Sequence, residues 1–317
     1  MNIPSRESVK QARILANIMA QPYLLLMLAP MFWGGNIVAG RLAVGQINPQ
    51  ILLIGRWLGA TLILLAIALP HVKRDWPKLR ESLWLLGLFG IFGFACFNIL
   101  LYNAAHFTSA INISIENGAI PVFVLLGNFL FFSVRAKRRQ ILGLVLTLIG
   151  IVWVATGGEP KRLLSLNVNI GDGMVLLACL FYAAYSLTLR FRPDIHWLSF
   201  LFVTTAAALL ASITFQLTVG GGLFAILPEI QATTALGWTC VLYVMIFPSI
   251  LSQLFFARGV ELIGANRASI FINLIPVMGT LLAVLILGET FKTYHLVASA
   301  LVLAGIMLSE YTTRRHL

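Results

Sequence analysis

Residues 109–122 read SAINISIENGAIPV, and residues 264–277 read GANRASIFINLIPV. When the second stretch is set against the first at an offset of 155 positions, both carry a Ser-Ile pair and both end in Ile-Pro-Val. The same offset brings Gly150–Ile151 onto Gly305–Ile306 without a gap. Fragments that agree in order and spacing over such a length indicate one structural unit used twice.

The composition places both units in a lipid environment. Apolar residues make up 59% of the 317 residues, charged residues only 10%, and the mean hydropathy is +0.92. A soluble domain usually has about a quarter of its residues charged. The net charge of +11 would suit a nucleic-acid binder, but the basic residues stand in short segments between apolar stretches, as they do around a bilayer. We therefore expect membrane lipid as a partner and no nucleic acid.

Ten apolar segments are long enough to cross a bilayer, for which a helix needs about 20 residues. They are 22–40, 50–70, 83–105, 109–132, 140–157, 171–190, 196–218, 235–257, 264–287 and 293–311. Polar clusters between them, among them His71–Glu81, are expected to form loops. The sequence therefore predicts an all-α membrane protein with ten transmembrane helices in two inverted five-helix repeats, because an odd number of spans turns the second unit over.

The distribution of basic residues predicts the orientation. Alternate loops hold 17 Lys and Arg on one side and 4 on the other, with Arg56 inside the second span. This bias places both termini of a multi-pass membrane protein in the cytoplasm. The predicted parts are a cytoplasmic tail (1–21), a first repeat (22–157), a periplasmic linker (158–170), a second repeat (171–311) and a cytoplasmic tail (312–317).

Patterns typical of enzymes and motors are missing from the sequence. Cys96, Cys179 and Cys240 lie in separate apolar stretches, which predicts neither disulfides nor a metal site. There is no GxxxxGK[ST] run for a nucleotide and no HExxH zinc motif. We expect no cofactor and no enzymatic activity.

Several short motifs follow one another along the chain. They are Phe32–Trp33–Gly34–Gly35–Asn36, Pro49 with Arg56, Pro121, Gly171–Asp172, Pro276 and Leu287–Gly288–Glu289. Over about residues 22–311 the sequence resembles the EamA family of the drug/metabolite transporter superfamily. The resemblance implies a ten-helix carrier that commonly exports amino acids and related metabolites from bacteria, with spans 1, 3, 4, 6, 8 and 9 around a cavity. The sequence departs from the family pattern at one place. Gly288–Glu289–Thr290 of the second repeat aligns with Ser133–Val134–Arg135 of the first, so the acidic motif occurs only once.

Charged side chains within the predicted spans are candidates for coupling or gating. Glu116 stands about seven residues into the fourth span, roughly 10 Å deep, where a carboxylate usually faces a cavity or a partner. Three roles are open to it: a structural ion pair with Arg56, a carboxylate that couples protons or binds a substrate amine, and a hydrated residue at a loosened helix end. Arg56 could instead hold a substrate carboxylate, serve gating, or reach the headgroups. His106, near the outer face, could titrate in a proton path.

Polar and aromatic side chains in the spans are candidates for substrate contact. Pro121 and Pro276 should kink their helices, and Asn117 and Asn273 beside them could bind a ligand or satisfy the kink. The other candidates for the cavity wall are Trp33, Asn36, Asn98, Tyr102, Tyr182, Tyr185 and Gln253. Side chains of these types equally fill seams between helices.

The leading functional prediction is a secondary transporter that exports small amphipathic metabolites, amino acids or related compounds first among them, by alternating access. Protons are the coupling ion that Glu116 would suit. The alternatives are a nucleotide-sugar or phosphorylated-metabolite exchanger, which would need more cavity Lys and Arg, and a facilitative, channel-like uniporter. The oligomeric state stays open.

Overall fold

The computed structural model describes residues 17–133, 137–159, 161 and 169–313. Within that part of the chain the structure is helical and holds no strand. Seven of the described helices are long and apolar enough to cross a membrane, and two shorter apolar helices follow them. The chain is thus an all-α membrane protein. Most of the predicted tails and of the predicted linker lies outside the described residues.

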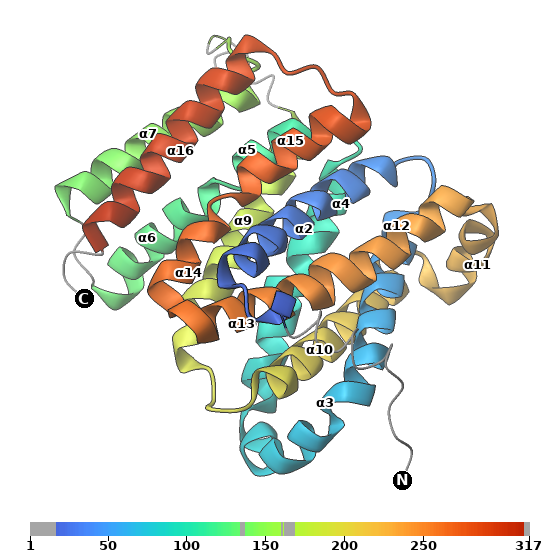
Figure 1. Cartoon of the computed structure of the whole chain (residues 1–317). Coiled ribbons are helices and arrows are strands. Elements are labelled where there is room, and N and C mark those ends of the chain that lie inside the picture. Colours follow the sequence, from blue (N-terminus) through green and yellow to red (C-terminus); the bar gives the residue numbers. More distant parts are fainter. Residues whose placement is uncertain (1–16, 134–136, 160, 162–168, 314–317) are drawn as a thin grey trace.

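The helices of Figure 1 are named in chain order. Their bounds are α2 (Pro22–Leu42), α3 (Pro49–Leu88), η1 (Phe89–Cys96), α4 (Phe97–Ala104), α5 (Ala110–Glu116), α6 (Ala119–Phe132), α7 (Arg138–Ala155), α9 (Ile170–Thr188), η2 (Leu189–Phe191), α10 (Trp197–Thr218), α11 (Gly222–Ala232), α12 (Ala235–Ile246), η3 (Phe247–Leu251), α13 (Ser252–Ile263), α14 (Ala265–Ile272), α15 (Ile275–Leu287) and α16 (Thr293–Thr313).

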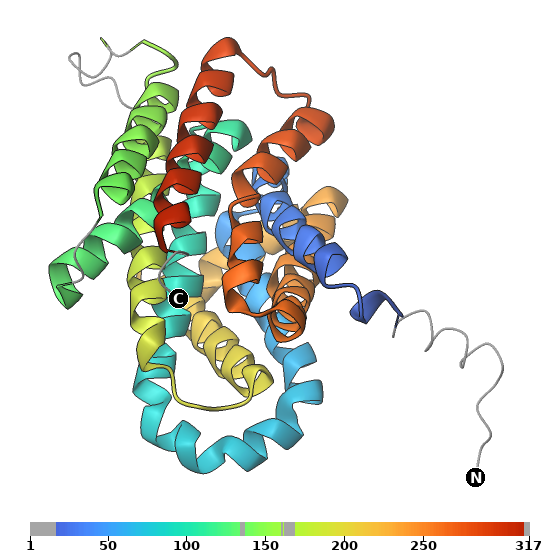
Figure 2. The ribbon, with the colours of Figure 1, turned by 60° about the vertical axis from the view of Figure 1, so that its left-hand side comes forward.

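The second and third predicted spans form one continuous helical path. α3 continues through Pro70 and Pro77 into η1 and α4 without a break. The loop expected at His71–Glu81 is therefore wrong: that segment is helical and follows the curved arc at the bottom of Figure 2. Its Lys, Arg, Leu and Glu residues are good helix formers, and the two prolines bend the helix instead of ending it.

Two helices are broken at corresponding places. The fourth predicted span splits into α5 and α6 at Asn117–Gly118, and the ninth splits into α14 and α15 at Asn273–Leu274. Pro121 and Pro276 each stand in the first turn of the helix that follows the break, where a missing amide donor costs little. Each break falls about one turn before its proline, because proline leaves the carbonyl there without its usual donor.

Two π-helical segments also occupy corresponding places. η1 covers Phe89–Cys96 and η3 covers Phe247–Leu251; positions 92–96 of η1 coincide with η3 when the offset of 155 is applied. Such wide turns occur mostly as single bulges in α-helices and often mark functional sites. The sequence predicted neither of them.

The packing joins the two halves of the chain. α2 lies against α13 and α15, while α9, which has the corresponding place in the second half, lies against α4 and α6. α7 and α16 run side by side at one edge of the molecule (Figure 1). The crossing of α2 and α15 is close, since a Cβ atom on Gly34 would lie only 2.6 Å from the backbone nitrogen of Gly279. Small residues permit this approach of two membrane helices.

Candidate functional site

A buried arginine lies where four elements meet. Arg56 of α3 is only 5% exposed. Its Nη1 donates hydrogen bonds to Asn36 Oδ1 at 2.8 Å, Asn98 Oδ1 at 2.7 Å and Tyr102 Oη at 2.7 Å. Its Nε donates to Ser249 Oγ at 2.7 Å. These partners come from α2, α4 and η3, so both halves of the chain contribute to this arginine cluster.

The partners of Arg56 are all neutral. Its guanidinium also lies 4.4 Å from the centre of the Trp57 ring, and within the described chain no carboxylate forms an ion pair with it. The second terminal nitrogen, Nη2, makes no hydrogen bond to the described residues. A buried charge is normally compensated by an opposite one. The cluster therefore keeps a positive charge and a free donor for an anionic group.

The π-helical segments explain how these side chains reach Arg56. Ser249 stands in η3 and donates its hydroxyl to the carbonyl of Val244, five residues earlier, at 2.7 Å. Asn98 follows η1 and donates its amide to the carbonyl of Phe94 at 2.8 Å. Each side chain thus satisfies a carbonyl in a distorted turn and offers its remaining lone pairs to the arginine. Sequence reasoning missed Ser249, although Pro248 before it marks a distortion in an apolar helix.

An aromatic wall continues from the arginine cluster toward α9. Trp57 stacks on Phe94 with ring centres 5.4 Å apart, and Phe94 contacts Tyr185 at 5.8 Å. Tyr185 contacts Tyr182 at 5.3 Å, and Tyr182 packs on Phe97 at 5.2 Å. The structure thus connects Tyr182 and Tyr185 with the arginine cluster through rings on α3, η1 and α4.

In the described part of the chain, three predicted wall residues form no hydrogen bond or ring contact with that cluster. Trp33 packs on Phe256, with ring centres 5.6 Å apart. Gln253 and Asn273 are half-buried and make no hydrogen bond to the described residues. The contacts therefore bring Asn36, Asn98 and Tyr102 together with Arg56 and leave these three residues apart.

Glu116 does not pair with Arg56. It ends α5 and is fully buried, and neither of its carboxyl oxygens has a hydrogen-bond partner among the residues that the structure describes. The ion pair considered from the sequence is thus absent between these two described residues. Glu116 instead faces the carboxyl group of Asp172, near the start of α9. Sequence reasoning placed Asp172 in a family motif but missed it as a partner, since the two residues lie far apart in the chain.

Asn117 serves the helix break. Its amide donates to the carbonyl of Ile113 at 2.9 Å. The Cys179 thiol of α9 lies 3.6 Å from the carbonyl oxygen of Glu116 and 3.7 Å from Oδ1 of Asn117. The contacts of Asn117 thus satisfy the broken end of α5 and join it to α9.

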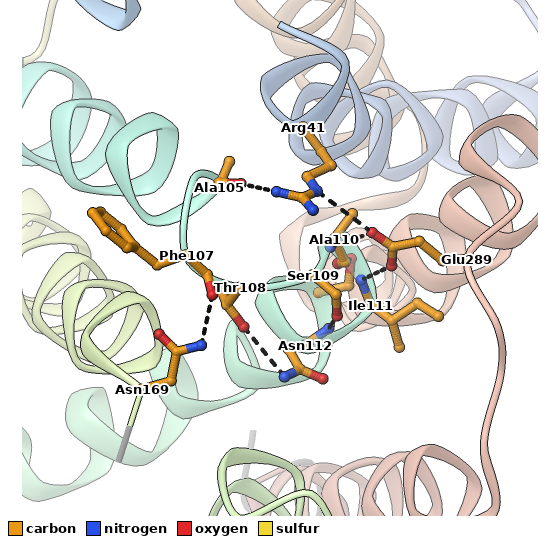
Figure 3. A network of polar contacts seen from close by, with 11 residues as sticks. Arg41, Ala105, Phe107, Thr108, Ser109, Ala110, Ile111, Asn112, Asn169 and Glu289 are labelled. Carbon is orange, nitrogen blue, oxygen red and sulfur yellow. Dashed lines mark hydrogen bonds and ion pairs between the residues drawn. The ribbon is translucent and has the colours of Figure 1, made fainter. Parts of the chain in front are cut away.

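The start of α5 is held by the acidic residue that occurs in one repeat only. Glu289 accepts the backbone amides of Ala110 at 2.9 Å and Ile111 at 3.0 Å, through its two carboxyl oxygens. Arg41 bridges this carboxylate, 4.0 Å away, and the carbonyl of Ala105 (Figure 3). The carboxylate therefore caps the helix and compensates the arginine.

His106 lies beside this capped end, between α4 and α5. Partial burial and, after it, the positive charge of Arg41 hold the pKa of His106 below its ordinary value of 6.5. The imidazole is thus neutral at pH 7.

An apolar cavity of about 430 Å³ lies elsewhere, between α5, α15 and α16. Its walls include Ile115, Pro276, Leu281 and Val302, and Leu281 is 50% exposed on the outer surface. None of the predicted polar side chains lines it. This cavity is distinct from the arginine cluster.

Comparison with known proteins gives a consistent family. The sequence matches the family model described as the EamA-like transporter family over residues 21–156 and again over residues 169–311. The uncharacterized transporter YyaM of Bacillus subtilis is 25% identical over 299 residues, which cover 92% of this chain and 94% of that protein. The uncharacterized inner membrane transporter YicL of Salmonella typhimurium is 22% identical over 301 residues, covering 92% and 96%.

A solved crystal structure shares the fold. It covers 93% of this chain and 98% of its own, with a TM-score of 0.57 at 17% sequence identity.

Proposed function

This chain belongs to the EamA-like transporter family, and from that premise we propose that it is a secondary transporter that exports small amphipathic metabolites by alternating access. Amino acids and related compounds with an apolar side chain are the proposed substrates. The chain would work in the bacterial inner membrane, with protons as the coupling ion and Glu116 as a coupling residue.

The proposed architecture is ten transmembrane helices in two inverted five-helix repeats, with both termini in the cytoplasm. Three observations support it: the family model matches twice, broken helices and π-helical segments recur at corresponding places, and α2 and α9 exchange equivalent contacts. Inverted repeats supply two related conformations, one open to each side of the membrane. Tags at the two ends should become accessible only after the cells are permeabilised.

The observation that carries the substrate class is the arginine cluster. Arg56 is buried, charged and bound only by neutral side chains, with Nη2 left unbonded by the described residues. A substrate carboxylate would supply the missing negative charge and accept from Nη2 in a charge-assisted hydrogen bond. A single arginine suits one carboxylate better than a diphosphate, which favours amino acids over nucleotide sugars.

The aromatic wall supports the amphipathic character. Tyr182 and Tyr185 follow Phe94 away from the guanidinium. A ligand with its carboxylate on Arg56 would lay an apolar side chain against these rings, an arrangement typical of sites with few polar contacts.

Counterflow in proteoliposomes tests the proposal. Vesicles loaded with unlabelled leucine should accumulate labelled leucine transiently, and external leucine should compete. Leucinamide keeps the side chain and the amine but lacks the carboxylate, so it should compete much more weakly. The absence of counterflow for leucine and other apolar amino acids, or equal competition by leucinamide, would contradict the proposal. Strong competition by a nucleotide sugar would favour the exchanger instead.

A further inference from the structure

Two acidic side chains from different halves of the chain meet inside the protein. Glu116 ends α5 in the first half, and Asp172 stands in the first turn of α9 in the second. Glu116 is 0% exposed and Asp172 is 2% exposed. Each carboxyl group is part of the electrostatic environment of the other, and the Thr108 hydroxyl is part of that of Asp172.

The surrounding contacts hold this acid pair together. The Cys179 thiol of α9 lies 3.6 Å from the carbonyl oxygen of Glu116. The side chain of Asn169, just before α9, donates to the carbonyl of Phe107 at 2.6 Å (Figure 3). A Cβ atom on Gly171 would lie within 2.9–3.1 Å of the chain at Ala104, Phe107 and Thr108. The start of α9 is therefore packed tightly on the segment that leads into α5.

No positive charge among the described residues compensates the acid pair. Both carboxyl oxygens of Glu116 and Oδ1 of Asp172 are enclosed and have no hydrogen-bond partner within the described ranges. In the described part of the chain, no Lys, Arg or His forms an ion pair with either residue. Burying one unpaired carboxylate is unfavourable, and two side by side repel each other as well. A proton between them removes one charge and supplies the missing hydrogen bond.

Apart from Cys179, the titratable groups near α5 are engaged elsewhere. Cys179 faces Glu116 from α9. α2 contributes Arg41, which pairs with Glu289 beyond α15 at the opposite end of α5. On α16, His295 accepts the amide of Lys292 at the start of its own helix. The acid pair thus depends chiefly on its own two carboxyl groups.

We propose that Glu116 and Asp172 form one proton-binding site between the two halves of the transporter, and that this proton couples export to the proton gradient. The inference rests on the proposed function and adds Asp172 and the stoichiometry to it. One proton binds as a shared O–H···O hydrogen bond while the carboxyl groups are in contact. When the halves move apart, that bond breaks, the proton leaves to water, and no other bond changes.

An exposed residue lies close to this site along the chain. Asn169 is exposed, and Asp172 follows it by three residues, or about 4.5 Å along a helix. A proton entering there would be exchanged for a substrate that leaves the cell, which is antiport with one proton per cycle.

The first test reads the proton directly and needs no substrate. Infrared difference spectra of the full chain in lipid, recorded between high and low pH, should contain the carbonyl band of a protonated carboxylic acid. Glu116→Gln and Asp172→Asn should each shift this band, because the remaining buried carboxyl group still binds a proton but without the shared hydrogen bond, and the double variant should remove the band. Glu81→Gln, at an exposed position, should leave the band unchanged. A band that survives both substitutions would overturn the inference.

The second test measures whether a pH gradient drives transport. With the membrane potential clamped, a one-to-one exchange across one pH unit should accumulate leucine about tenfold in vesicles that are acidic inside. Glu116→Gln and Asp172→Asn should abolish that accumulation but retain counterflow, and either variant alone suffices if the other does not fold. Accumulation driven by sodium instead of protons would overturn the inference. Absence of counterflow with an intact infrared band would refute the proposed function and leave the proton site standing.

Discussion

At the residue scale, the environment of Arg56 decides what it can bind. Three neutral groups share its Nη1, and Ser249 takes its Nε. These bonds fix the guanidinium without neutralising it. If Arg56 only stabilised the fold, we would expect a carboxylate to pair with it. Glu116 is the acidic residue considered for that role, but its neighbour is Asp172.

Replacing Arg56 by Gln should therefore weaken the binding of substrates that carry a carboxylate. The loss of a hydrogen bond to a charged group costs about 1.5–3 kcal/mol, so the KM for leucine counterflow should rise about 10- to 100-fold. Leucinamide should compete equally well with the variant and the parent. Arg80→Gln, at an exposed position, is the matched control. Equal losses for leucine and leucinamide would assign Arg56 a structural role.

The titration of His106 gives a second prediction at this scale. Its pKa lies below 6.5 because of partial burial and then the Arg41 charge. The unfolded chain therefore binds this proton more readily, and the contribution of His106 to stability falls as the pH drops through the unfolded pKa. Its midpoint in NMR titrations should lie below 6.5, and Arg41→Gln should raise it. A midpoint above 6.5 in the parent protein would be inconsistent with this geometry.

At the scale of the element, the length of the apolar segments predicted the helices but not their irregularities. Stretches of about 20 apolar residues find the spans because each must satisfy its own backbone in lipid. The polar segment His71–Glu81 is nevertheless helical, since proline kinks and charged residues do not end a helix that continues on both sides. The π-helical segments depend on tertiary contacts such as that of Ser249 with Arg56, which no local pattern contains.

The candidate site divides in the same way. Arg56, Asn36, Asn98 and Tyr102 could be predicted because polar side chains in a span are unusual. Ser249 and Asp172 were missed as partners, because a small hydroxyl is common in spans and because the acid pair forms only when distant helices meet.

The capped end of α5 yields a prediction for a single element. Glu289→Gln keeps an acceptor for one amide but loses the charge that faces Arg41 and the helix end. Unfolding in detergent should become easier by about 0.5–2 kcal/mol, the range measured for helix caps. The exposed Glu229→Gln should not change the unfolding temperature. A similar shift in both variants would mean that the cap contributes nothing specific.

At the scale of the whole molecule, the crossing of α2 and α15 holds the two halves together. A Cβ atom on Gly34 would lie 2.6 Å from the backbone of Gly279, whereas one on Gly87 would meet nothing within 4 Å. Gly34→Ala should therefore destabilise the protein by about 1–3 kcal/mol through overpacking. Gly87→Ala, also within a helix, should be neutral or slightly stabilising. The unfolding temperatures of the two variants are compared in the same detergent. Equal temperatures would show that α2 and α15 can move apart at the crossing without loss of stability.

The unbroken path through α3, η1 and α4 has a mechanical consequence. Two arms joined by a flexible tether could tilt independently, but these arms are joined by a continuous helical path around the bend. We therefore expect a tilt of one arm to move the other arm with it. Arg56 sits on one arm and Tyr102 on the other, and a ligand that pulls on the guanidinium would therefore load both arms at once.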